Sequence, residues 1–283
     1  MFIDQIREYL KDLAPQGLSR EYTVNLLREL LQYYVLSIIY NSNYKDVTFT
    51  GGTCLRICYG LDRLSEDIDI DCQTAIDAQK FAGYIVAQFN KMGFMNIEFS
   101  VKGQGRSIYL KFSLLKKLGL AAESQSDKLY AKVDLSINPA PTFDTDLYAI
   151  NRFDLSFLAR HYDLPSLFAG KLHAVFTRSF FRGKGDLINI KGRDFYDLLW
   201  LLNKKAVPNL KRLNEMLCVD SDLMFGDLNE LRSALLERVD AINPHFIYDD
   251  VRFFFKDAAY ITGVTKNYHS LIVKLLKDAW VDI

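Results

Sequence analysis

The chain has 283 residues, enough for one large domain or two ordinary ones, and 49% of them are hydrophobic. Because 35 Lys and Arg side chains balance 35 Asp and Glu side chains, a strongly basic nucleic-acid coat protein is excluded, and any nucleic-acid contact is restricted to a local patch. The hydrophobic fraction also excludes an intrinsically disordered chain.

Helices are predicted over the first ~45 residues, where apolar side chains recur at helical spacing after Ser19. Residues 1–16 carry charged side chains inside their apolar pattern, so we interpret them as an amphipathic helix and not as a signal peptide. No stretch approaches the roughly 18 apolar residues of a membrane span. The sequence therefore predicts a cytoplasmic protein that does not enter the membrane.

Short strands are predicted from Val47 onward, where the first of them ends at Gly51 and Gly52. A short helix is expected from Thr53 to Tyr59, with Gly60 at its carboxyl end. Further along, the patterns predict a strand at 67–72, a helix at 77–92, a hairpin of 96–101 with 106–114, and a strand at 128–137.

The pattern is helical from about residue 160 to the end of the chain. Expected helices run from Pro165 to about Phe180, over 193–204, and near 208–217, 222–240, 245–258 and 266–280. We therefore predict an α+β protein with a mixed domain at 1–158 and an all-helical domain at 159–283, with a cleft between the two lobes.

The turn Gly51-Gly52-Thr53 is a candidate phosphate-binding site. Glycines let the backbone approach a phosphate closely, and the N-terminus of the following helix offers N–H donors and a positive dipole end. Thr53 adds a hydroxyl group. An ordinary turn with no ligand is the alternative for this motif taken alone.

The strand Asp67-Ile68-Asp69-Ile70-Asp71 places three carboxylates on one face, because side chains alternate along a strand. Carboxylates held together in this way favour a bound cation such as Mg²⁺, with a solvated acidic face as the alternative. On a later strand, Asp134 lies on the polar face together with Lys132. Asp134 either completes a set of metal ligands or forms an ordinary salt bridge with Lys132.

The segment from Gly51 to Asp69 resembles the AbiEii/AbiGii-type nucleotidyltransferase toxins, which belong to the DNA polymerase β-like nucleotidyltransferase superfamily. The resemblance rests on the glycine turn, on Tyr59-Gly60-Leu61, and on the string from Arg63 to Asp69. It implies a polymerase β-like core with a mixed sheet and helices, followed by a C-terminal helical lobe.

Two motifs in the second half extend the resemblance: a lysine helix with Lys171 and Arg178, and the string Arg193-Asp194-Phe195-Tyr196-Asp197-Leu198. By resemblance, Asp67 and Asp69 are the metal-binding pair, and Lys171 and Asp194 are active-site residues. Lys171 and Arg178 are seven residues apart, which puts them on one face of the expected helix, where they would neutralise a triphosphate. Asp197 is expected to be structural and to pair with an arginine.

Arg63 is a further candidate phosphate contact, and Ser65 is expected either to touch phosphate or to cap the turn into the strand. The family also implies an NTP as substrate, Mg²⁺ as cofactor, and the 3′ end of tRNA as the acceptor in a toxin–antitoxin or abortive-infection system with a cognate antitoxin. Modification of a protein target and non-catalytic nucleotide binding are the alternatives.

Three further groups of residues are not expected to take part in catalysis. Cys54, Cys58, Cys72 and Cys218 have no histidine near them in the sequence and are interpreted as reduced thiols. The four histidines show no metal-ligand spacing and are expected to be structural. The basic, glycine-rich loop 182–193 is either a solvated loop or a clamp on an RNA backbone.

Overall fold

The computed structural model describes residues 2–137, 139–178, 180–182, 186–188 and 191–281, and it divides the chain into two compact units. The first unit comprises residues 1–58, 64–139 and 146–161, and the second comprises 59–63, 140–145 and 162–283. The predicted domains at 1–158 and 159–283 differ from the structural units in three short segments: residues 59–63 and 140–145 join the second unit, and residues 159–161 join the first.

A mixed sheet of seven strands forms the body of the first unit in the part of the chain that the structure describes. The strands lie in the order β3-β4-β5-β2-β1-β7-β6, so β2 is flanked by β5 on one side and by β1 on the other. Their bounds are β1 Thr48–Thr50, β2 Asp67–Cys72, β3 Glu98–Lys102, β4 Ser107–Ser113, β5 Lys128–Ile137, β6 Thr145–Arg152 and β7 Leu155–Tyr162.

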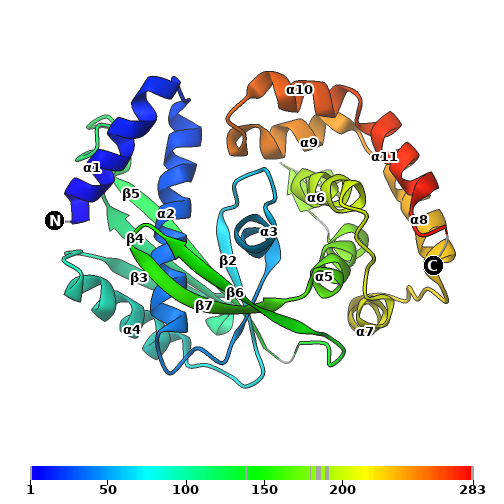
Figure 1. Ribbon diagram of the computed structural model, residues 1–283, viewed down its shortest axis with the longest axis horizontal. Coiled ribbons are helices and arrows are strands. Elements are labelled where there is room, and N and C mark those ends of the chain that lie inside the picture. Colours follow the sequence, from blue (N-terminus) through cyan, green and yellow to red (C-terminus); the bar gives the residue numbers. More distant parts are fainter. Residues whose placement is uncertain (1, 138, 179, 183–185, 189–190, 282–283) are drawn as a thin grey trace. The chain divides into compact units, whose positions relative to one another are not determined.

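Alternation explains the long central strands, because every second residue of β4 and β5 is buried while its neighbours are not. Helix α4 packs on β3 and β4 (Figure 1), and α2 packs on β5. The Phe89 ring of α4 packs edge-to-face on Phe112 of β4 with 5.1 Å between ring centroids. Tyr34 of α2 joins this aromatic layer. The polar residues of the sheet are thereby left on its other face.

The helices of the first unit begin where the sequence places side-chain caps. Ser19 accepts a hydrogen bond from the Tyr22 N–H and starts α2, and Asp77 accepts from two N–H groups and starts α4. The bounds are α1 Phe2–Leu13, the 3₁₀ turn η1 Ala14–Gln16, α2 Arg20–Tyr40, α3 Gly51–Tyr59, α4 Ala78–Lys91 and the 3₁₀ turn η2 Gly103–Gly105. Among the described residues, none of the helices has the length and apolar character that crossing a membrane requires.

The second unit consists mainly of helices that pack through aromatic side chains. Tyr268 is buried and its hydroxyl donates to the Phe195 carbonyl oxygen at 2.9 Å, while the Trp280 indole N–H donates to the Ala206 carbonyl oxygen at 2.9 Å. The helices are α5 Leu164–Thr177, α6 Gly192–Asn203, α7 Leu210–Asp220, α8 Leu228–Asp240, α9 Pro244–Val251, α10 Ala258–Lys266 and α11 Tyr268–Asp278, with the 3₁₀ turn η3 Arg252–Phe254 after α9.

The predicted α+β class, with a mixed sheet and helices toward the carboxyl end, is confirmed. Three local expectations were wrong. Helix α3 begins at Gly51 and not at Thr53, and α5 ends at Thr177 and not near Phe180. The third is the all-helical pattern after residue 160, because Phe180–Arg182 (β8) and Asp186–Ile188 (β9) pair as an antiparallel hairpin.

Candidate active site

Three carboxylates lie together on the polar face of the sheet. Strands β2 and β5 run parallel with Asp69 opposite Asp134, and Asp67 lies two residues before Asp69 on the same face. All three side chains are partly exposed. The structure thus brings together the residues that the sequence offers as metal ligands, and their metal-binding role stays a prediction.

Lys132 lies among these carboxylates. Its Nζ is 2.6 Å from an Asp134 oxygen and 3.6 Å from an Asp67 oxygen, and the Ser107 hydroxyl donates to the other Asp134 oxygen at 2.6 Å. Burial alone would lower the pKa of Lys132, but the hydrogen bond to Asp134 and the charge of Asp67 raise it. The carboxylates therefore bind the positively charged Lys132 ammonium group. Their oxygen atoms are also ligands of the kind that a divalent ion such as Mg²⁺ prefers.

Gly51 places the start of α3 directly against Asp69. Its backbone has a φ of +76°, and a Cβ at this position would lie 1.8 Å from an Asp69 carboxylate oxygen. A side chain is excluded here for two reasons, because the backbone conformation is left-handed and the space is filled. The N–H donors at the amino end of α3 consequently begin beside a carboxylate of the set.

Thr53 and Ser65 are both held within the protein. Thr53 is fully buried, and its hydroxyl donates to the Asp67 backbone carbonyl oxygen. Ser65 is also buried, and the Gln32 side-chain amide donates to its carbonyl oxygen at 3.0 Å and to that of Glu66 at 2.9 Å. Thr53 thus connects α3 to β2, and phosphate binding at the glycine turn stays a prediction.

A second cluster of charges lies within the second unit. The Lys171 Nζ is 2.7 Å from Asp197 and 3.8 Å from Asp194, and Arg178 donates to Asp194 at 2.6 Å. The prediction that Lys171 and Arg178 share a helix face was wrong, because α5 ends at Thr177 and Arg178 has an extended backbone. The two cations nevertheless meet at the Asp194 carboxylate.

Arg63 and Asp197 form a two-pronged ion pair in the same unit, with N···O distances of 2.6 and 2.7 Å. This is the arginine partner expected for Asp197. Burial would raise the pKa of Asp197, but the charges of Arg63 and Lys171 lower it to about 2. The Arg63 guanidinium is buried and bound to Asp197, so the phosphate contact expected for Arg63 does not match its position in this structure.

The neighbouring Asp62 accepts hydrogen bonds from two tyrosines. The Tyr196 hydroxyl donates to its carboxylate oxygens at 2.8 and 2.9 Å, and the Tyr260 hydroxyl donates at 3.2 Å. Burial and the Asp62 carboxylate raise the pKa of Tyr196. The residue pair Asp62-Arg63 is thereby anchored to α6 at Tyr196 and Asp197, a connection that the sequence spacing does not reveal.

Cys54, Cys58 and His161 form another potential ligand group, with their ligand atoms all within 4.8 Å of one another. Cys54 and Cys58 are one turn apart on α3, and His161 comes from β7, which pairs with β1 at Phe49. Their three ligand atoms are of the types that zinc prefers. Nothing in the sequence indicates that His161 lies beside these reduced thiols, because only the sheet pairing brings His161 to α3.

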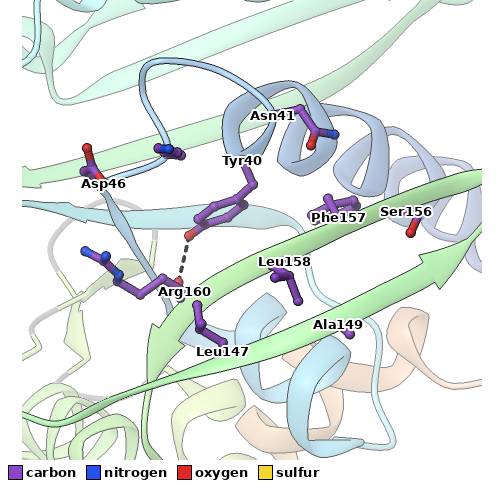
Figure 2. Close-up of a pocket in the computed structure, with 10 residues that line it drawn as sticks. Tyr40, Asn41, Asp46, Leu147, Ala149, Ser156, Phe157, Leu158 and Arg160 are labelled. Atoms are coloured by element: carbon purple, nitrogen blue, oxygen red, sulfur yellow. Dashed lines mark hydrogen bonds between the residues drawn. The ribbon is translucent and has the colours of Figure 1, made fainter.

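A hollow of about 590 Å³ lies elsewhere on the first unit, between the end of α2 and strands β6 and β7. Figure 2 shows the Tyr40 ring within it, with the hydroxyl donating to the Arg160 carbonyl oxygen at 2.7 Å. None of the predicted site residues lines this hollow. The structure does not describe most of the loop 182–193 or its side chains. The RNA clamp considered for this loop, with the side chains of Arg182 and Lys184, therefore lies outside the described part of the chain.

The family model described as "Nucleotidyl transferase AbiEii toxin, Type IV TA system" matches residues 36–220 of the chain. Two solved structures from Helicobacter pylori show a likeness. The first, described as a "putative nucleotidyltransferase", is 19% identical with a TM-score of 0.48 and covers 89% of this chain and 96% of its own. The second, JHP933, is 18% identical with a TM-score of 0.48 and covers 93% and 96%. A comparison with curated sequences gives no match.

Replacement of Gly51 by alanine tests the contact with Asp69, and Gly60 is the matched control because its φ is +77° with nothing within 4 Å of a Cβ. Each change costs about 1–2 kcal/mol for a side chain in left-handed backbone. In G51A the clash adds about 1–3 kcal/mol. Denaturant unfolding measures both, and equal destabilisation of the two variants would contradict the close approach.

The D197N variant tests the buried ion pair, because it leaves Arg63 and Lys171 without their shared carboxylate. We expect a loss of about 3–5 kcal/mol in unfolding free energy at neutral pH. The pKa of Asp197 lies at about 2, below its ordinary 3.8, so the stabilisation is complete above that ordinary value and is lost as the pH falls through about 2.

The control for D197N is E123Q, which removes an exposed ion pair with Lys116 at 3.2 Å and is expected to cost less than about 1 kcal/mol. Unfolding is measured for both variants across the acidic range. A D197N deficit that stays constant down to the lowest pH would show that the Asp197 charge is not what stabilises this region.

Proposed function

Since this chain belongs to the AbiEii family of nucleotidyltransferase toxins, we propose that it transfers a nucleoside monophosphate from an NTP to the 3′ end of tRNA. Such an addition blocks aminoacylation and so arrests translation, which is how the enzyme would act as a toxin. Because the family is that of type IV toxin–antitoxin systems, it implies an antitoxin as partner.

One observation carries the proposal for the chemistry: the Asp67, Asp69 and Asp134 carboxylates share one face of the sheet, and the start of α3 at Gly51 touches Asp69. Carboxylates beside the N-terminus of a helix supply oxygen ligands and N–H donors at the same place. A metal–triphosphate complex needs both kinds of group. An acidic strand without a helix N-terminus beside it would offer oxygen ligands for the metal but no N–H donors for the triphosphate.

In the proposed reaction an acceptor hydroxyl attacks the α-phosphorus of the NTP, a new O–P bond forms, and the bond to pyrophosphate breaks. Asp67 and Asp69 are the proposed holders of Mg²⁺, with Asp134 as the third ligand, and a carboxylate of this set accepts the hydroxyl proton. When bound, the ion supplies Lewis-acid stabilisation of the phosphate charge. Lys132 keeps these carboxylates in place until substrate and metal bind.

The backbone N–H groups after Gly51 are proposed to bind the triphosphate, at the positive end of the α3 dipole. Lys171 and Arg178 are proposed to neutralise phosphate charge in the same reaction, and Asp194 positions both cations through its two oxygens. Arg178 is the more exposed of the two and is therefore better suited to direct contact with a substrate.

Isosteric variants of the aspartates test the assignment. We expect D67N and D69N to lose at least about 100-fold in transfer rate while retaining their folded structure, since each removes a charge that holds the metal. The exposed Asp146 on β6 is the control, and D146N is expected to behave as the wild type. Full activity of either site variant would disprove the metal assignment.

The assay incubates the wild type with α-labelled NTPs, total RNA and cell protein in the presence of Mg²⁺. Label in RNA, mapped to the 3′ end of tRNA, is the expected result, and chelation of the metal should abolish it. Label in protein instead would identify a protein target, and nucleotide binding without any transfer would identify a non-catalytic nucleotide-binding protein. Either outcome would refute the proposed reaction.

Lys171 is tested by K171A against H173A, a change on the same helix in a residue that pairs with Asp220 at 2.9 Å. We expect K171A to lower kcat by about 10-fold or more, because a phosphate-neutralising cation acts mainly in the transition state. Unfolding curves of both variants separate this effect from lost stability. A K171A enzyme with unchanged kcat would assign Lys171 to structure only.

A further inference from the structure

A second pocket lies on the polar face of the sheet, beside the carboxylate set and within the first unit. It encloses about 410 Å³, within the range of roughly 300–1,000 Å³ typical of ligand sites. Asp67 forms part of its wall, so the pocket reaches a proposed metal ligand. The function proposed above leaves this pocket without an occupant.

The floor of the pocket is a row of four side chains in register across four strands. Asp67 lies opposite Lys132, Lys132 opposite Tyr109, and Tyr109 opposite Ser100. At roughly 4.8 Å between neighbouring strands, the row extends about 14 Å away from Asp67. This length is sufficient for more than one nucleotide of an extended chain.

The walls of the pocket are basic and aromatic. Arg28, Lys102, Lys111 and Lys132 outnumber the two acidic residues Glu66 and Asp67 that also line it. The Tyr109 ring lies beneath two of the cations, with the Lys102 Nζ 5.1 Å and the Lys132 Nζ 5.8 Å from its centroid. Cations beside aromatic rings are the usual means of binding single-stranded nucleic acid, through phosphates and stacked bases.

Ser100 adds an independent observation. Its hydroxyl oxygen is buried and has no hydrogen-bond partner among the described residues, although the side chain lines the pocket. A buried hydroxyl normally has a partner, because leaving it unpaired costs free energy. A bound ligand with a donor or acceptor at this end of the row would supply the missing partner.

The order of the strands indicates on which side of β2 the NTP and the acceptor would each bind. The triphosphate is proposed at the start of α3, which follows β1, and β1 lies on one side of β2 while β5, β4 and β3 lie on the other. In phosphoryl transfer the attacking and leaving oxygens lie roughly in line on opposite sides of phosphorus. With pyrophosphate leaving on the β1 side, the attacking hydroxyl comes from the side of the basic pocket.

We propose that this pocket binds the single-stranded 3′ end of the RNA acceptor, with Lys102 and Lys111 on its phosphates and Tyr109 stacked on a base, an inference that rests on the transfer to RNA proposed above. Lys132 and Asp67 mark the end at which the terminal hydroxyl reaches the α-phosphate. The pocket is then an acceptor site, separate from the nucleotide site at Gly51.

The test measures binding of a labelled single-stranded oligoribonucleotide by the full chain, without NTP, over a series of salt concentrations. The double variant K102A/K111A is expected to bind at least about 10-fold more weakly, and its salt slope should fall by about 1.4, because each phosphate contact on a single strand contributes about 0.7. The control K80A/K91A removes the same charge from α4, where both lysines are exposed.

Tyr109 is tested by Y109L against Y109F. The leucine variant should lose about five-fold or more in oligonucleotide affinity, while the phenylalanine variant keeps the stacking surface and the affinity. For all pocket variants, the affinity for Mg·NTP should stay within about two-fold of the wild type. If the pocket binds the triphosphate instead, the pocket variants would lose affinity for Mg·NTP and keep their affinity for the oligonucleotide.

The inference would also be overturned if the wild type bound no oligonucleotide, or if K102A/K111A and K80A/K91A bound it equally. Both are read in a binding assay that needs no transfer. The proposed function is refuted separately, by label that appears in protein or nowhere in the transfer assay. If the wild type labels RNA and the pocket variants bind and react as the wild type does, the proposed reaction stands and this acceptor site is wrong.

Discussion

The parallel hydrogen bonding between β2 and β5 is the constraint on which the candidate site depends. It sets Asp69 opposite Asp134 and Asp67 opposite Lys132, while β1 sets Thr50 opposite Asp69. A shift of one residue would turn the carboxylates toward the apolar layer and Ile68 and Ile70 toward solvent. The buried isoleucines therefore hold the register, and the hydrophobic effect that stabilises the sheet also gathers like charges on its other face.

The cost of gathering these charges is reduced by the elements around them. Lys132 neutralises part of the negative charge, and Ser107 donates a hydrogen bond to Asp134. On the other side of β2, the start of α3 brings a positive dipole end to Asp69, which is possible because Gly51 has no side chain. Thr53 connects the same helix turn to the Asp67 carbonyl oxygen, so a hydrogen bond joins the glycine turn to the aspartate strand.

The sequence predicts β2 and β5 with their observed bounds, because polar and apolar residues alternate along both strands. It predicts neither β6 nor β7. Seven of the eight residues of β6 are exposed, so this strand leaves no periodic signal. Partners in space are equally hidden: the pairs of Arg63 with Asp197 and of His161 with Cys54 join residues more than 100 positions apart. The aspartates and glycines of the candidate site could be proposed from the sequence because their pattern is local, whereas the row from Asp67 to Ser100 appears only once the strand order is known.

The connection between α3 and β2 is bound by the motif Arg193–Leu198 of α6, in which Asp194 and Asp197 have different partners. Residues 59–63 belong to the second unit, although the elements before and after them belong to the first. Asp62 and Arg63 are the last two residues of this segment, and their partners Tyr196 and Asp197 are neighbours on α6. Asp197 is fully buried and satisfied by Arg63 and Lys171, so it fixes the connection, whereas Asp194, three residues earlier, holds the more exposed Arg178. The two aspartates of one short motif thus have different roles. Asp197 holds the backbone that leads into the aspartate strand, and Asp194 holds the cations that are proposed to bind phosphate.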